Sequence, residues 1–250
     1  MTTRLFHISD VHFGVEDRCA LEAVEQAVRD EKPDALICTG DLTQRAKDSE
    51  YAAAANWFGG LGVPVVLEPG NHDMPYYNLI ERFTDPYRRY RKLEAAVGCT
   101  LETEHVVLVS LKTTVRAQKR FPWSDGVVTR QALDHTLARL EQLKEDGRSI
   151  IVTGHHPLLG SDDALSNPTK GGDRAFAAIA KAGANAILSG HIHKPLDEVR
   201  ERDGHSMRMI GAGTLSTRLR HGAPPSYRVI SCFADRTISS ELRLLHAEPR

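Results

Sequence analysis

Five short polar segments of the chain carry residues that can bind metal ions, and each follows an apolar stretch. In chain order they are Asp10-Val11-His12, Gly40-Asp41, Gly70-Asn71-His72-Asp73, Gly154-His155-His156 and Gly190-His191-Ile192-His193. Carboxylate, imidazole and amide groups suit Mn, Fe, Zn or Mg, and no cysteine occurs in these segments. The chemistry that such a ligand set supports is metal-assisted hydrolysis.

The spacing within these segments favours shared coordination. Residues i and i+2 of an extended segment point to the same face, so Asp10 and His12 are expected to bind one ion together. His191 and His193 repeat this spacing. Glycines also precede several of the candidate ligands and permit sharp turns and close approach to a ligand. The ligands preceded by glycine are Asp41, Asn71, His155 and His191.

A pair of ions would give these ligands a defined chemistry. Two metal ions about 3.5–4 Å apart can share a bridging carboxylate and hold a hydroxide nucleophile between them. The ions also neutralise phosphoryl oxygens during in-line displacement. The leaving oxygen still needs a proton, which a histidine beside the metals but not bound to them can supply.

Alternating strands and helices must bring the five segments together. Apolar runs predict strands at residues 5–8, 35–39, 63–67, 105–111, 149–153 and 184–188, and helical spacing predicts helices at 17–29, 49–61, 85–97, 130–145 and 173–181. Three further strands are predicted at 207–210, 227–233 and 238–244. This order indicates an α/β fold, in which ligands bind at the carboxyl ends of the strands.

The length and composition favour one folded unit. The chain has 250 residues, 41% of them hydrophobic, which is enough for one substantial core. We expect a single domain over residues 1–250, with the metal-ligand motifs in 10–193 and the C-terminal strands at about 205–245. The least regular stretches, 112–128 and 157–172, are expected to face the substrate.

Charge, cysteine content and hydropathy limit the binding partners and the cellular location expected for the chain. The net charge of −1 argues against nucleic acid as a partner, although local cations could still bind a small anionic substrate. No transmembrane segment or signal peptide is expected. The four cysteines have no C-x-x-C pair, so we expect buried, reduced thiols and a cytoplasmic protein. They are Cys19, Cys38, Cys99 and Cys232.

Taken in order, the five segments resemble the calcineurin-like metallophosphoesterase family, whose pattern is D-x-H, G-D, G-N-H-[D/E], H and G-H-x-H. The resemblance spans Asp10 to His193, and no motif residue is missing. It implies a four-layer α/β/β/α sandwich and a small phosphate-ester substrate. The phrases Asp-Val-His-Phe-Gly, Gly-Asp-Leu-Thr and His-His-Pro are most similar to the class III cyclic-nucleotide phosphodiesterases. The implied reaction is therefore phosphodiester hydrolysis, with a small (cyclic) nucleotide as the leading substrate.

The resemblance also implies a role for each motif residue. Asp10, His12 and His193 resemble the ligands of a first metal ion, and Asn71, His155 and His191 resemble those of a second. Asp41 resembles the carboxylate that bridges the two ions, which would be Mn, Fe or Zn. His72 resembles a histidine that meets the substrate phosphate and protonates the leaving group. Asp73 resembles a residue that orients His72 through a hydrogen bond.

Several features keep more than one interpretation. His156 could contact substrate or, as we favour, fix His155. The cluster 88–92, which holds three arginines and a lysine, could bind an anionic partner, but a solvated helix face is favoured. The segment Phe121-Pro122-Trp123 could stack on a base or on an apolar part of the substrate, or it could fill a local core.

Alternative functions remain within and outside this enzyme class. A nuclease or a nucleotide-lipid pyrophosphatase of the same superfamily is the second enzymatic hypothesis. A nuclease would be expected to carry a more basic surface, and a lipid hydrolase an exposed apolar or basic patch. A non-catalytic interaction scaffold would have lost metal ligands, and none is lost here. Related phosphodiesterases also suggest a homodimer by analogy.

Overall fold

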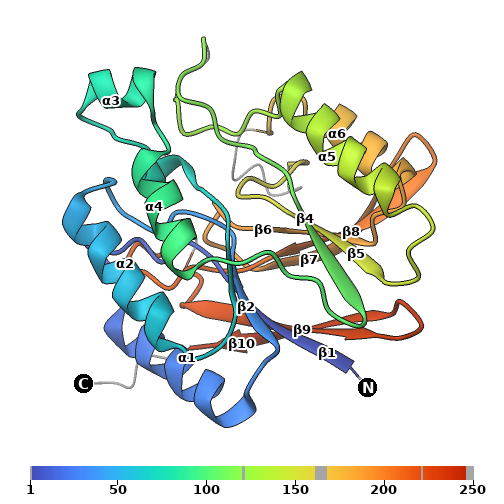
Figure 1. Ribbon diagram of the computed structural model, residues 1–250, viewed down its shortest axis with the longest axis horizontal. Coiled ribbons are helices and arrows are strands. Elements are labelled where there is room, and N and C mark those ends of the chain that lie inside the picture. The colour runs from blue at the N-terminus through green and yellow to red at the C-terminus, as the bar shows by residue number, and fades with distance from the viewer. Residues whose placement is uncertain (1, 120–121, 161–167, 221, 246–250) are drawn as a thin grey trace.

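The architecture is two five-stranded sheets packed face to face, with helices on both outer faces (Figure 1). The computed structural model describes residues 2–119, 122–160, 168–220 and 222–245. The strand order in the first sheet is β10-β9-β1-β2-β3, and in the second it is β4-β5-β6-β8-β7. The first sheet comprises β1 (Thr2–Ile8), β2 (Ala35–Cys38), β3 (Val65–Leu67), β9 (Ser226–Phe233) and β10 (Ile238–Leu244). The second comprises β4 (Val106–Ser110), β5 (Ser149–Thr153), β6 (Ala186–Ser189), β7 (Leu196–Arg202) and β8 (His205–Gly211).

Alternating side chains of each strand build separate core layers. In β1, Phe6 packs with the helices outside the first sheet, whereas Leu5 packs between the two sheets. The same alternation places Leu36 outside and Ile37 between the sheets. Because successive strand residues point to opposite faces, a continuous apolar run serves both layers. The expected four-layer α/β/β/α sandwich is confirmed.

The helices divide between the two outer faces. Helices α1 (Arg18–Glu31), α2 (Asp48–Gly60) and α4 (Arg88–Val97) cover the first sheet, while α5 (Arg130–Gln142) and α6 (Gly172–Lys181) cover the second (Figure 1). The short helix α3 (Leu79–Thr84) stands apart from this packing. Two N-caps set helix starts: Asp17 accepts a hydrogen bond from the Ala20 N–H in α1, and Thr129 from the Ala132 N–H in α5. No helix in the described ranges is long and apolar enough to span a bilayer.

Parallel pairing brings the predicted segments to one edge. β1, β2 and β3 pair in parallel, and so do β4, β5 and β6. Their carboxyl ends therefore point the same way within each sheet, and the loops that follow β1, β2, β3, β5 and β6 carry the five polar segments. The third of these loops opens with a single 3-10 turn, η1 (Asn71–Asp73).

The cysteine expectation is wrong in part. All four cysteines are free thiols, but only Cys38 and Cys232 are buried. Cys19, in α1, and Cys99, two residues after the end of α4, are exposed to solvent.

Candidate metal centre

The loops after β1, β2, β3, β5 and β6 bring all seven predicted metal ligands together. Four overlapping groups place one donor atom of each member within 4.8 Å of the others. These groups are Asp10, His12 and His193; Asp10, Asp41 and His155; His155, His156 and His191; and His12, Asp41 and His72. Asn71 joins them because its Oδ1 lies 3.2 Å from His155 Nε2.

The first set of donors is built around Asp10. Its Oδ1 lies 3.1 Å from His193 Nε2 and 3.7 Å from His12 Nε2, and the two imidazole nitrogens are 3.2 Å apart. Within the described residues, Asp10 Oδ1 is a buried acceptor without a hydrogen-bond partner. A buried carboxylate oxygen in that position needs a partner, and a cation between these three side chains would supply it.

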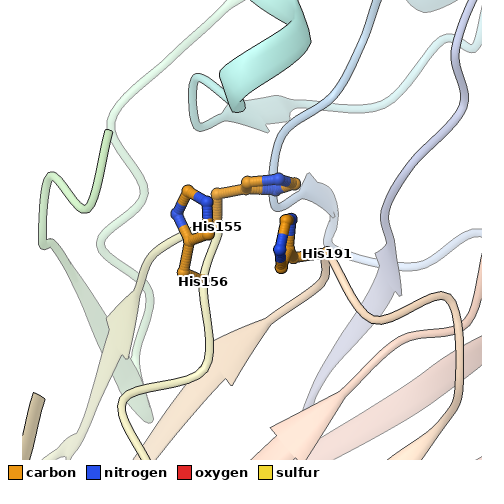
Figure 2. A group of neighbouring side chains, drawn as sticks. All are labelled: His155, His156 and His191. Carbon is orange, nitrogen blue, oxygen red and sulfur yellow. The ribbon is translucent and has the colours of Figure 1, made fainter. Parts of the chain in front are cut away.

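The second set lies on the other side of Asp41. Asp41 Oδ2 is 3.4 Å from His155 Nε2 and 3.7 Å from His12 Nε2, so it lies between the two sets. Figure 2 shows the rings of His155 and His191, from the loops after β5 and β6, pointing toward one another. Their centroids are 5.2 Å apart.

Backbone carbonyls fix which nitrogen of two histidines is available. His155 Nδ1 donates to the carbonyl of Thr39 at 2.8 Å, and His193 Nδ1 donates to the carbonyl of Arg218 at 2.7 Å. With a proton on Nδ1, each ring directs its Nε2 atom into the cluster. This arrangement of a second hydrogen bond behind the donor nitrogen is typical of metal-binding histidine.

The electrostatics of the cluster suit cations. Burial lowers the pKa of His12 and of His191 to about 3, so both rings are neutral and can donate a lone pair. Burial also acts against the charged form of His155, but Asp41 outweighs it and raises the pKa to about 9. Burial would raise the pKa of Asp10, yet its interaction with His193 lowers it, so this group is a carboxylate. A cation binding here therefore replaces a proton on His155.

His156 is held by the loop opposite the cluster. Its Nε2 lies 2.8 Å from the carbonyl of Ser124, and its Nδ1 lies 2.9 Å from the hydroxyl of Thr113, which also accepts from the His156 backbone N–H. The Ser124 carbonyl requires the proton on Nε2, so the Thr113 hydroxyl donates to Nδ1. Both ring nitrogens of His156 are thus engaged in hydrogen bonds within the protein. The His156 ring also lies next to that of His155, with the two centroids 4.7 Å apart (Figure 2).

Asp73 does not orient His72 as the resemblance implied. Its carboxylate accepts hydrogen bonds from the backbone N–H groups of Leu42, Thr43 and Gly70 and from the Thr43 hydroxyl. Asp73 therefore joins the loop after β3 to the loop that carries Asp41. The ring of His72 is held instead by the carbonyl of Gln44, which accepts from Nδ1 at 2.7 Å.

The extended geometry expected for Asp10 and His12 is also wrong. Both have left-handed backbone conformations, with φ of 53° and 52°, and His191 and His193 have φ of 71° and 57°. Tight turns, rather than strand alternation, direct these side chains inward. At Gly190, a Cβ atom would collide with Ser9 Oγ and lie 2.5 Å from Asp10 Oδ2, so this position requires glycine.

An open cavity of about 490 Å³ lies over the cluster and contains residues that the sequence patterns did not predict. Three arginines line it, namely Arg45, Arg218 and Arg220. A guanidinium nitrogen of Arg218 lies 3.2 Å from His72 Nε2 and 3.2 Å from Gln44 Oε1. Isolated arginines outside a motif give no sequence signal, so only the fold identifies them. Ser124 and Asp125 also line the cavity, so part of the loop 112–128 does face the site.

The loop 157–172 contributes two leucines to the core. Residues 161–167 of that loop and Phe121 lie outside the described residues, while Leu158 and Leu159 fill the core beside α6.

The basic cluster 88–92 lies in α4. There Arg88, Arg89 and Arg91 form ion pairs with acidic side chains, so this surface is a charge-balanced helix face. The acidic partners are Glu81, Asp48 and Asp85, respectively.

Comparison with known proteins identifies the same family that the five sequence motifs resemble. The model of the calcineurin-like phosphoesterase family matches residues 3–195. A probable cyclic nucleotide phosphodiesterase of Synechococcus is 28% identical over 206 residues, covering 78% of this chain and 74% of the relative. A glycerophosphodiester phosphodiesterase of Enterobacter lignolyticus is 31% identical over 209 residues, covering 76% of this chain and 70% of the relative.

Solved structures share the fold at low sequence identity. A dimetal phosphatase from Danio rerio superimposes with a TM-score of 0.69 at 11% identity, covering 97% of this chain and 99% of the other. A purple acid phosphatase from yellow lupin gives a TM-score of 0.65 at 12% identity, covering 98% of this chain and 52% of the other. The matched family model, the curated relatives and the clustered carboxylate and imidazole donors lead to one conclusion: the chain belongs to the calcineurin-like phosphoesterase family and is a metal-dependent phosphoric ester hydrolase.

Proposed function

We propose that the chain hydrolyses a phosphodiester with two metal ions. Asp10, His12 and His193 would hold the first ion. Asn71, His155 and His191 would hold the second, and Asp41 would bind both. The observation that carries this assignment is the position of Asp41 Oδ2, 3.7 Å from His12 Nε2 and 3.4 Å from His155 Nε2.

The donor set indicates the kind of metal. Four imidazoles, two carboxylates and one amide favour Mn, Fe or Zn over a soft thiophilic ion. Bound cations of this type supply an activated water molecule and neutralise charge on the phosphoryl oxygens. The chain itself positions the ester: the Arg218 guanidinium at the cavity wall can donate to a phosphate oxygen.

His72 is proposed to protonate the leaving group. Its Nδ1 is bound to the Gln44 carbonyl, and its Nε2 is directed toward Arg218 at the cavity. In this contact Nε2 accepts from the Arg218 guanidinium. An imidazolium ring, which carries a second proton on Nε2 once Arg218 has turned to the phosphate, could pass that proton to the departing oxygen as a general acid. Asp73 contributes indirectly, because it holds the loop that carries Asp41 against the loop that carries His72.

The leading substrate is a small nucleotide, and a cyclic nucleotide is the first candidate. The names of several curated relatives support this choice, and the cationic cavity favours an anionic ligand of limited size. A glycerophosphodiester is the second candidate, supported by the name of the relative that is 31% identical. We also propose a cytoplasmic location, because all four cysteines are free thiols.

Hydrolysis of bis-p-nitrophenyl phosphate tests the proposed function. Purified protein with added Mn²⁺ should release p-nitrophenol, and EDTA should abolish the release. Asp41→Ala should lose activity, while the matched control Asp134→Ala, an exposed aspartate on α5, should keep it. Comparison of kcat/KM for cyclic nucleotides, glycerophosphodiesters and phosphomonoesters then ranks the substrates. Undiminished activity after rigorous chelation, or in Asp41→Ala, would refute the proposal.

A further inference from the structure

An aromatic pocket opens directly beside the metal centre. This cavity of about 290 Å³ is lined by Asn71, Tyr76, Arg82, Trp123 and Ser124. It shares Asn71, Tyr76 and Ser124 with the larger cavity over the cluster, so the two are contiguous. A phosphate ester held at Asn71 would therefore have one of its substituents beside Trp123.

The indole of Trp123 is held in place but not covered. The guanidinium of Arg82 lies 5.5 Å from the indole centroid, and the ring of Phe83 meets it edge-on at 6.2 Å. Arg82 is itself fixed, because its Nε donates to the carbonyl of Arg116 and its side chain is almost fully buried. Trp123 nevertheless remains 37% exposed and Tyr76 60% exposed, so a large part of each ring is available to a ligand.

His156 fixes the distance between this pocket and the metal donors. Its ring bonds the Ser124 carbonyl, next to Trp123, and the Thr113 hydroxyl, farther back in the same loop. The ring also packs 4.4 Å from that of His191. His156 is therefore a positioning residue: it ties the loop that carries Trp123 to the histidines of the metal centre.

We propose that this pocket binds the base of a nucleotide whose phosphate lies at the metal centre, with Trp123 as the residue that determines specificity. The inference rests on the proposed function and deepens it by assigning the base of the substrate to a subsite. Flat aromatic groups stack on exposed indole and phenol rings, and every base offers such a face. Among the described residues, the lining includes no carboxylate, and its charged side chain, Arg82, already contacts the indole and donates to the carbonyl of Arg116. A flat, uncharged group fits this lining better than a second phosphate does.

Binding of AMP and of ribose 5-phosphate tests the inference, because ribose 5-phosphate carries a hydroxyl where AMP carries the base. Isothermal titration calorimetry of the Mn²⁺-loaded protein should show AMP binding at least about tenfold more tightly. Trp123→Ala should remove that preference and leave the Kd of ribose 5-phosphate unchanged, while Trp123→Phe should retain most of it. Ile80→Ala is the matched control, because Ile80 is an exposed apolar residue of α3 outside the pocket lining.

A second readout does not depend on the Trp123→Ala variant folding. In Trp57→Phe, which leaves Trp123 as the remaining tryptophan, AMP should quench the fluorescence and ribose 5-phosphate should not. Equal affinity of the wild type for both ligands, equal weakening of both by Trp123→Ala, or the same loss in Ile80→Ala would overturn the assignment. None of these measurements requires turnover, so a protein that prefers AMP but hydrolyses no diester would refute the proposed function alone.

Discussion

The backbone N–H of His191 donates a hydrogen bond of 2.8 Å to Asp10 Oδ2, across a separation of 181 residues. This contact directly joins the first and last of the motifs that carry the proposed metal ligands. It leaves Asp10 Oδ1 directed at His193, and it brings Gly190 so close to Ser9 that no side chain fits between them.

Gly190→Ala should therefore damage both stability and metal binding. The added Cβ would collide with Ser9 Oγ and press on Asp10, at an expected cost of about 1–3 kcal/mol in the free energy of unfolding. Urea denaturation measures this cost. Gly60→Ala is the control: it meets no atom within 4 Å and should change stability by less than about 1 kcal/mol. Equal stability of the two variants would contradict the packing described here.

His72→Ala should separate catalysis from metal binding. If His72 delivers a proton from Nε2, its loss should lower kcat by roughly 10²–10⁴-fold while the metal content stays unchanged. The decrease should be larger for alkyl esters than for bis-p-nitrophenyl phosphate, because p-nitrophenolate leaves without a proton. Metal content by atomic emission, with the exposed His135→Ala as control, checks the assignment. A metal-depleted His72→Ala protein would make His72 a ligand instead.

Arg218→Ala should lower kcat/KM, because it removes a hydrogen bond to the substrate phosphate. Its guanidinium lines the cavity beside His72, and a charge-assisted hydrogen bond contributes about 1.5–3 kcal/mol. Loss of that bond corresponds to a decrease in kcat/KM of roughly 10–100-fold. Arg218→Lys should recover part of the activity, and Arg130→Ala, an exposed arginine at the start of α5, should be silent. An unchanged kcat/KM in Arg218→Ala would remove this residue from the site.

Glu68 should make stability fall as pH rises. It is buried between the sheets, where it accepts hydrogen bonds from Ser110 and Thr153, and burial raises its pKa from 4.5 to about 7. The folded state then binds a proton more tightly than the unfolded state, so this group's contribution is full below about pH 4.5 and is lost as pH rises to about 7.

The comparison of Glu68→Gln with wild type isolates this effect. Relative to Glu68→Gln, the wild type should lose on the order of 3 kcal/mol of unfolding free energy between pH 5 and pH 8.5. Chemical denaturation at several pH values measures the difference. The exposed Glu22→Gln should show no such trend. A pH-independent difference between wild type and Glu68→Gln would show that Glu68 does not titrate in this range.

The sequence predicted those parts of the fold that have a strong periodic pattern. Buried parallel strands such as β5 read as apolar runs, and the polar residues after them had to meet at the carboxyl edge. Strand β7 was missed because Leu196–Arg202 alternates charged and half-exposed residues at a sheet edge and buries no apolar face. Helix α3 was missed because its six residues are too few to show helical periodicity.

The residues of the candidate site also divide into those that the sequence predicted and those that only the fold identifies. The seven proposed ligands lie in short motifs, so their clustering could be anticipated. The role of Asp73 could not, because the choice between a ring nitrogen and three backbone N–H groups depends on loop geometry. Arg218 and Trp123 come from loops without a motif, and only the fold places them beside His72 and Asn71.

Anomalous diffraction from crystals grown with Mn²⁺ tests the two-metal assignment most directly. We expect two peaks about 3.5–4 Å apart, one among Asp10, His12 and His193 and the other among Asn71, His155 and His191. Both peaks should lie within coordination distance of Asp41. A single peak, or a second one that is bound by His72 and does not touch Asp41, would refute the two-metal assignment.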